Sequence, residues 1–257
     1  MKQNEPSENS NEKTEKQEKR EFFLDRLIAK IRNPLLRELA EWIEMLAVAA
    51  AVAFLINYTI VANSAVPTGS MEKTIEAGDR VVGSRLHYFF EEPERGDVVI
   101  FRLGWQCRHC KAQDELPAPD VCPDCGKSLS SYATVYYVKR VIGLPGDRVE
   151  IRAGGSCAQS QIVSEVRQMF PEDKKDLEVM TAAVYVNGEK LEESYLREPM
   201  LYYGDMSFEV PENCYFMLGD NRNNSKDARY WKNSYIERDR IIAKVLFRYW
   251  KKVSLIK

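Results

Sequence analysis

Val66-Pro67-Thr68-Gly69-Ser70-Met71 is the stretch around which the rest of this 257-residue chain is organised. It places a serine between a glycine and a methionine, shortly after a long apolar run ends. Proline fixes φ and glycine relaxes it, so the backbone can turn sharply here and present the Ser70 hydroxyl outward. Thr-Gly-Ser is also ordinary turn chemistry. Whether Ser70 is a nucleophile therefore depends on the residues that accompany it further along the chain.

The apolar run before this turn, residues 45–62, reads MLAVAAAVAFLINYTIVA and contains no charge. At about 1.5 Å per residue it is just long enough to cross a hydrocarbon core, so we predict a transmembrane helix. A buried core helix is the alternative, because Asn57 and Thr59 make the last turn less apolar. Basic residues are more frequent before the run than after it. The positive-inside rule then places the N-terminus in the cytoplasm and the chain after residue 62 outside.

The chain before this run has two parts. Residues 1–20 are mostly Glu, Lys, Asn, Gln and Ser without apolar periodicity, which predicts a disordered, solvated cytoplasmic tail. Within residues 21–44, apolar residues recur at helical spacing and Asn33-Pro34 interrupts the pattern. We therefore predict juxtamembrane helices over residues 21–44.

The chain after the run, residues 63–257, has the pattern of a mainly β domain. Runs of β-branched and aromatic residues alternate with turn signals, and Asn187-Gly188 is a strong hairpin signal. This predicts an antiparallel β domain outside the membrane. Two segments interrupt the pattern: residues 104–128 are rich in cysteine, and residues 155–180 predict a short helical insertion broken at Pro171.

Composition excludes some functions. The chain has 37 basic and 39 acidic residues, so it lacks the basic excess that nucleic-acid binding requires. Its two histidines, His87 and His109, leave little room for a Ser-His-Asp triad.

Lys139 lies within an apolar strand, between Val138 and Arg140. Most strand lysines face solvent. A lysine held in apolar surroundings, however, has a lowered pKa, and its neutral amine can take the proton from a serine hydroxyl. Ser70 and Lys139 are therefore the nucleophile and base that this sequence offers.

Four segments of the chain resemble, in order, the motifs of bacterial type I signal peptidases, and the resemblance covers roughly residues 40–250. It implies an antiparallel signal-peptidase-like domain behind a single-pass anchor in the bacterial cytoplasmic membrane. It also implies a serine endopeptidase that removes signal peptides from exported preproteins after a small-x-small motif, without a cofactor for catalysis. The segments are Pro67-Thr68-Gly69-Ser70-Met71, Gly78-Asp79-Arg80-Val81, residues 139–147 (KRVIGLPGD) and residues 219–229 (GDNRNNSKDAR).

By this resemblance Ser70 is the nucleophile and Lys139 the general base. The Ser70 amide and the Thr68 hydroxyl would stabilise the oxyanion. Ser225 would hydrogen-bond to Lys139 and orient it. Shallow pockets for small side chains would be lined by Val66, Pro67, Met71, Ile75, Tyr137 and Val138.

The resemblance also implies a supporting ion pair between Asp227 and Arg229. Three residues nearby depart from the family's usual pattern. Asn223 stands where aspartate is usual, Ala228 where serine is usual, and Lys232 where glycine is usual. None of these departures removes a reacting group, so we expect activity.

Four cysteines form a second candidate site: Cys107-x-x-Cys110 and Cys122-x-x-Cys125 have the spacing of a zinc ribbon. We predict one structural zinc held by four thiolates. The alternative is two disulfides, because the predicted location is oxidising. Cys157 and Cys214 form a separate disulfide or remain two buried thiols; the sequence leaves both open.

Two rival functions follow from the same residues. A self-cleaving repressor would use Ser-Lys chemistry, but the apolar run and the missing DNA-binding segment argue against it. A non-catalytic membrane-anchored protein could instead use the zinc ribbon to bind a partner, on a decayed peptidase scaffold. The expected partners of the peptidase are preproteins and membrane lipid. Phe89, Phe90 and Trp105 are candidates for contact with the lipid surface or, equally, for the core.

Overall fold

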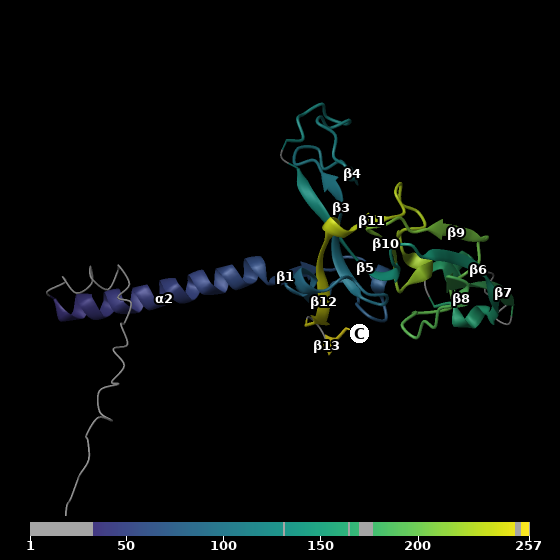
Figure 1. Cartoon of the computed structure of the whole chain (residues 1–257), viewed down its shortest axis with the longest axis horizontal. Coiled ribbons are helices and arrows are strands. Elements are labelled where there is room, and N and C mark those ends of the chain that lie inside the picture. Colours follow the sequence, from purple (N-terminus) through teal and green to yellow (C-terminus); the bar gives the residue numbers. More distant parts are fainter. Residues whose placement is uncertain (1–32, 131, 164, 170–176, 250–252, 257) are drawn as a thin grey trace, which may run out of the picture. The chain divides into compact units, whose positions relative to one another are not determined.

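The computed structural model describes residues 33–130, 132–163, 165–169, 177–249 and 253–256. The chain forms two compact units, one ending at Leu55 and the other beginning at Ile56 (Figure 1). The predicted tail, residues 1–20, and the first predicted juxtamembrane helix lie outside the described residues.

Helix α2 spans Pro34–Thr59. The Asn33 side chain accepts the Leu35 amide at 3.0 Å, and Pro34 occupies a first-turn position where its missing N–H costs nothing. The predicted transmembrane segment, residues 45–62, is helical only to Thr59, because Val61–Ala65 forms strand β1. Within the described residues, no helix is both long and apolar enough to cross a membrane. The predicted transmembrane helix is therefore not confirmed.

Nine described strands form the first sheet, in the order β1-β2-β12-β3-β5-β10-β11, with β13 paired to β12 and β4 to β3. Every pairing is antiparallel, as predicted for this part of the chain. The strands are β1, β2 (Arg80–Ser84), β3 (Val98–Gln106), β4 (Gln113–Glu115), β5 (Ala133–Gly143), β10 (Cys214–Leu218), β11 (Ile236–Glu237), β12 (Ile241–Arg248) and β13 (Ser254–Leu255).

A second antiparallel sheet has the order β8-β7-β6-β9. Asn187 and Gly188 turn β7 into β8 with φ of 52° and 87°, the left-handed geometry of a tight hairpin, so the predicted hairpin is confirmed. The strands are β6 (Arg148–Ala158), β7 (Glu178–Val186), β8 (Glu189–Lys190) and β9 (Met206–Glu209).

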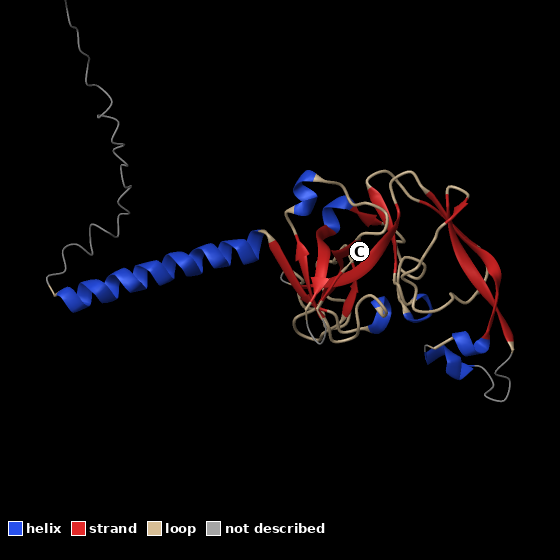
Figure 2. Ribbon diagram, turned by 90° about the horizontal axis from the view of Figure 1, so that it is seen from below, coloured by secondary structure: helices blue, strands red, loops and turns tan. Residues whose placement is uncertain are grey.

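The predicted helical insertion, residues 155–180, is wrong over its described parts. Strand β6 continues to Ala158, which pairs with Glu178 of β7. Val179 and Thr181 are buried while their neighbours are more exposed, which is the two-residue period of a strand. Helical structure among the described residues of this segment is limited to two short 3₁₀ helices, η2 (Gln159–Gln161) and η3 (Glu165–Met169). They lie at the end of the β6–β7 strand pair (Figure 2). Pro171 lies outside the described residues.

The two faces of β5 contribute to different hydrophobic clusters. Val138 belongs to a cluster with Val66, Met71 and Ile75. Tyr137, the preceding residue, packs against the larger cluster that contains residues of both sheets. Lys139 is therefore placed on a strand whose two faces are covered by apolar side chains. The remaining short helices are η1 (Gly69–Met71), α3 (His87–Phe90), η4 (Arg222–Asn224) and η5 (Arg238–Arg240).

Candidate functional site

Ser70 lies in the 3₁₀ turn η1 and is 7% exposed. Asn221, on the loop after β10, makes two hydrogen bonds to this turn. Its backbone amide donates to the Ser70 carbonyl at 3.1 Å, and its side-chain Nδ2 donates to the Gly69 carbonyl at 3.0 Å. Gly219 makes this approach possible, because a Cβ at that position would collide with the Ser70 carbonyl and the Ser225 hydroxyl. The loop and the turn therefore form one packed unit.

Lys139 extends from β5 to the serine, and its Nζ donates to Ser70 Oγ at 2.5 Å. The lysine is 2% exposed, and burial lowers its pKa to about 8, although the carboxylates of Asp227 and Asp220 act in the opposite direction. A neutral amine at this distance can take the hydroxyl proton. The two residues predicted from sequence are thus brought together, 69 positions apart in the chain.

A buried ion pair fixes the strand next to this lysine. Arg140 donates to both carboxylate oxygens of Asp220, at 2.8 and 2.7 Å, and its guanidinium lies 3.9 Å from the centre of the Tyr195 ring. Thr74 donates to the same carboxylate at 2.5 Å. Such bidentate pairs set orientation as well as distance. We did not predict roles for Arg140, Asp220 or Asn221; the motifs 139–147 and 219–229 contain all three, which was the available signal.

The other predicted catalytic residues lie around the pair. Thr68 Oγ1 is 3.4 Å from Ser70 Oγ. The Ser225 hydroxyl is buried and has no hydrogen-bond partner among the described residues, so its expected bond to Lys139 is absent there. Asp227 accepts from Arg229 at 2.8 and 2.9 Å and from the Gly219 amide at 3.1 Å. The acidic residue thereby connects the arginine to the loop that supports the serine turn.

The predicted pocket residues fall in two places. Val66, Met71, Ile75 and Val138 lie together in one cluster, and Pro67 beside them is exposed. Tyr137 lies on the other face of β5, with its ring 5.7 Å from Lys139 Nζ. Five of the six predicted pocket residues therefore lie on the Val138 side of β5, and Tyr137 lies next to the lysine.

The three departures from the family pattern have structural partners. Asn223 donates to Glu198 at 2.6 Å and to the Pro199 carbonyl at 3.0 Å, which an aspartate could not do. Ala228 is fully buried in the larger cluster, where a methyl group fills the space. The Lys232 amide donates to the Glu115 carboxylate, on strand β4 of the cysteine-rich segment.

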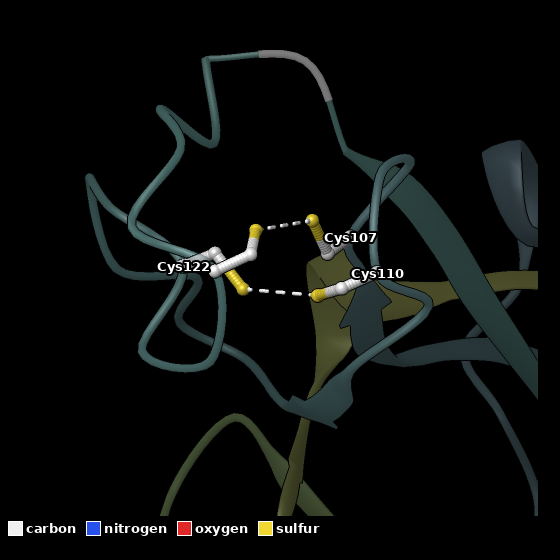
Figure 3. A group of neighbouring side chains, drawn as sticks. Cys107, Cys110 and Cys122 are labelled. Carbon is white, nitrogen blue, oxygen red and sulfur yellow. Dashed lines mark hydrogen bonds between the residues drawn. The ribbon is translucent and has the colours of Figure 1, made fainter.

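The four cysteines of that segment also come together (Figure 3). Cys107 Sγ lies 3.7 Å from Cys125 Sγ, and Cys110 Sγ lies 3.5 Å from Cys122 Sγ. All four sulfurs lie within 4.8 Å of one another. Zn–S bonds of about 2.3 Å at tetrahedral angles separate sulfurs by about 3.8 Å. The thiols therefore fit a tetrahedral metal ion.

Two equivalent turns present these thiols. In each turn the first cysteine's carbonyl accepts an amide four residues on: Lys111 to Cys107 at 3.1 Å, and Gly126 to Cys122 at 2.9 Å. Lys111 and Gly126 both have left-handed φ, 66° and 68°. The amides of Cys110 and His109 point at Cys107 Sγ and lower the pKa of that thiol. The Ala112 amide acts on Cys110 in the same direction, but burial and the neighbouring sulfurs outweigh it and raise the pKa of that second thiol.

All six cysteines are free in the structure. Cys157 lies on β6 and Cys214 on β10, and both are partly buried thiols rather than a disulfide. Trp105 is 2% exposed and packs inside the cysteine-rich segment, so of the two roles that the sequence left open the structure gives it the core role. Phe89 and Phe90 are largely exposed.

Comparison with known proteins assigns the chain to a class. The family model "Signal peptidase, peptidase S26" matches residues 39–250. The chain therefore belongs to the signal peptidase family, peptidase S26. The predicted resemblance to type I signal peptidases is confirmed, because relatives carry that name.

Two relatives are similar over most of this chain. Signal peptidase IB of Staphylococcus aureus is 30% identical over 231 residues, which cover 83% of this chain and 91% of the relative. Probable signal peptidase I-2 of Synechocystis is 31% identical over 186 residues, 72% of this chain. The chain spans 61% of the length of that second relative. A signal peptidase I structure from Enterococcus faecalis matches 60% of this chain and 97% of its own, at 22% identity and a TM-score of 0.31.

Proposed function

We propose that this chain is an active endopeptidase that removes signal peptides from exported preproteins after a small-x-small motif. Membership of the signal peptidase family supports the substrate class. The observation that carries the chemistry is the buried contact of 2.5 Å between Lys139 Nζ and Ser70 Oγ. No cofactor is needed for the reaction, because an amine and a hydroxyl suffice for acyl transfer.

In the proposed reaction, neutral Lys139 takes the proton of Ser70 as Oγ attacks the scissile carbonyl carbon. The carbonyl oxygen becomes an oxyanion, which the Ser70 amide and the Thr68 hydroxyl stabilise. Lys139, now an ammonium, gives its proton to the leaving amine as the peptide C–N bond breaks. A water molecule then attacks the acyl-enzyme ester, Lys139 takes the water's proton, and the proton returns to Ser70 as the signal peptide leaves.

The residues around the pair support this reaction by holding it in place. Asn221 fixes the carbonyls of the serine turn, so the Ser70 amide keeps one direction. Asp227 binds Arg229 and the Gly219 amide, and its charge also keeps the lysine pKa from falling further. We assign the preference for small residues to shallow pockets lined by Val66, Met71 and Val138, whose side chains belong to one apolar cluster.

The test is cleavage of synthetic signal-peptide substrates by the purified chain. We expect cleavage when alanine stands at the first and third positions before the scissile bond, and a strong loss of rate with leucine at the first. The matched control is Ser70→Ala, which changes one atom and should be inactive. Equal rates for alanine and leucine would contradict the pocket assignment. No cleavage of any substrate by a folded chain would favour the non-catalytic, zinc-ribbon alternative.

We propose further that α2 anchors the chain in a bacterial cytoplasmic membrane, with the N-terminus in the cytoplasm and the peptidase domain outside. Large apolar side chains on the helix are exposed, among them Leu46 and Phe54 at 62% and 71%. Such a surface favours lipid over water. A reporter that is active only outside the cytoplasm should work when fused after Ile75. The same reporter fused after Arg32 should be silent, and the reverse pattern would overturn the orientation.

We also propose that the cysteine cluster holds one structural zinc. The sulfur separations and the two equivalent turns support four thiolate ligands, and the free thiols do not favour disulfides. A small segment of this kind gains folding free energy from metal binding. Elemental analysis of the purified chain should give one zinc per chain. Absence of metal, together with a mass lower by four hydrogens, would mean disulfides instead.

A further inference from the structure

The loop between β8 and β9 of the second sheet contacts the segment that carries the serine. The Lys73 ammonium, shortly after the serine turn, donates to the carbonyls of Ser194 and Leu196 at 2.7 and 2.8 Å. The backbone amide of Arg197 donates to the Asp220 carbonyl at 3.4 Å. This loop therefore contacts both the serine segment and the loop after β10. The proposed reaction gives it no role.

The backbone at Lys73 indicates that these contacts hold the serine segment in place. Lys73 has a φ of 83°, in the left-handed region that a residue with a side chain rarely adopts. Such a conformation persists only where the surrounding structure enforces it. The two bonds from its ammonium to the β8–β9 loop supply part of that constraint.

Glu72 places a negative charge beside the serine turn. Its carboxylate lies against Gly69, the residue before the nucleophile, because a Cβ on Gly69 would collide with it. Asn221 Nδ2 lies 3.4 Å from the same carboxylate. The Glu72 side chain is only 21% exposed, so water and salt screen its charge in part.

A charge at this position opposes the proposed reaction. The scissile carbonyl is neutral in the bound substrate, and its oxygen becomes negative as the Ser70 Oγ attacks. An unpaired carboxylate next to the turn would therefore destabilise the transition state more than the bound substrate. Its signature would be a lower kcat with little change in KM.

Arg197 supplies the opposite charge. Its guanidinium pairs with the Glu72 carboxylate, and its own backbone is bonded to the Asp220 carbonyl. A guanidinium keeps its proton at any pH at which the protein is folded, so this neutralisation does not depend on pH.

We propose that Arg197 is a positioning residue of the peptidase that acts through Glu72. It fixes that carboxylate against Gly69 and offsets its charge while the oxyanion forms. The second sheet thereby contributes, through the β8–β9 loop, to a reaction whose nucleophile and base lie elsewhere. This inference rests on the proposed function, since the oxyanion arises only during cleavage.

The test measures kcat and KM on a synthetic signal-peptide substrate in two backgrounds, wild type and Glu72→Gln. In the wild-type background, Arg197→Met should lower kcat about tenfold and change KM by less than about twofold. In the Glu72→Gln background, the same substitution should lower kcat by less than about twofold, because no carboxylate remains to be neutralised. Arg197→Lys keeps the charge and should restore most of the rate.

The matched control is Arg152→Met. Arg152 pairs with Glu150 on the same strand, β6, and that pair lies within the second sheet. The control also removes one arginine from a partly exposed ion pair, and it should keep the wild-type kcat. Circular dichroism of every variant checks that the chain is folded.

The outcomes separate this inference from the proposed function. A wild-type chain that cuts no substrate overturns both. If the wild-type chain cuts and Arg197→Met is equally fast, only the role of Arg197 is overturned. An equal loss of kcat in both backgrounds also overturns it, because the arginine would then merely tie the loop in place. A rise in KM at unchanged kcat would contradict it as well, since that pattern indicates a contact with the bound substrate.

Discussion

The proposed catalytic pair and the cysteine cluster are assembled in opposite ways. Ser70 and Lys139 are far apart in the chain and meet only because two hydrophobic clusters and a supporting loop hold their segments together. The four cysteines lie within one short segment, where two equivalent turns aim them at a common point. The first site therefore depends on burial and tertiary packing, and the second on local turns and on the proposed bonds to a metal ion. Perturbations of one should leave the other largely intact.

The largest effect should come from the catalytic pair itself. Ser70→Ala and Lys139→Arg should each lower kcat by about 10⁴-fold or more, because arginine keeps its proton at any workable pH. Zinc content should not change in either variant. Single-turnover cleavage and elemental analysis on the same samples measure both quantities. Substantial activity in Lys139→Arg would exclude lysine as the base.

The next largest effect is the pH dependence. The pKa of Lys139 is lowered to about 8, and only the deprotonated amine is a base, so kcat/KM should rise about tenfold per pH unit below 8 and level off above 9. Asp227 raises this pKa in the wild type, so Asp227→Asn should move the profile to lower pH. A profile that is flat from pH 6 to 9 would be incompatible with this role of Lys139. Circular dichroism at each pH checks that folding is unchanged.

A smaller effect on the whole molecule should follow from loss of the cluster. Cys110→Ser should remove the zinc and expose the segment to proteolysis, while cleavage of a short peptide stays within about twofold of wild type. Cys157→Ser is the matched control, since that thiol lies on the second sheet, and it should keep the metal. A large loss of short-peptide cleavage in Cys110→Ser would show that the two sites are coupled.

The smallest effect concerns the link between the two regions. The Lys232 side chain is 70% exposed, so its ion pair with Asp114 should contribute no more than about 1 kcal/mol. A double-mutant cycle of Lys232→Ala and Asp114→Ala, followed by thermal unfolding, measures the coupling. The backbone bonds to Glu115 remain in both variants. A coupling well above 1 kcal/mol would mean that the ion pair, rather than those bonds, attaches the segment.

How far the sequence predicted the molecule depends on the range of the interactions. Asn187-Gly188 specifies its hairpin locally, and the cysteine spacing specifies its turns in the same way. The helical prediction for residues 155–180 was wrong because the two-residue alternation of β7 becomes a strand only through pairing with β6, which the sequence does not display. The Arg140–Asp220 ion pair could not be predicted from the sequence either, because it joins two segments that come into contact only in the folded sheet. Burial of Trp105 depends on the cysteine-rich segment folding over it.

The pairing of β3 with β5 bears on how this chain could be engineered. Gln106, the last residue of β3, lies directly opposite Ala133, the first of β5. Neighbouring strands are about 5 Å apart, so the ends of everything between them could be joined by a tight turn. Residues 107–132 could thus be removed as a cassette without shifting the register of the sheet. The same junction is a ready insertion point for a foreign domain with closely spaced termini.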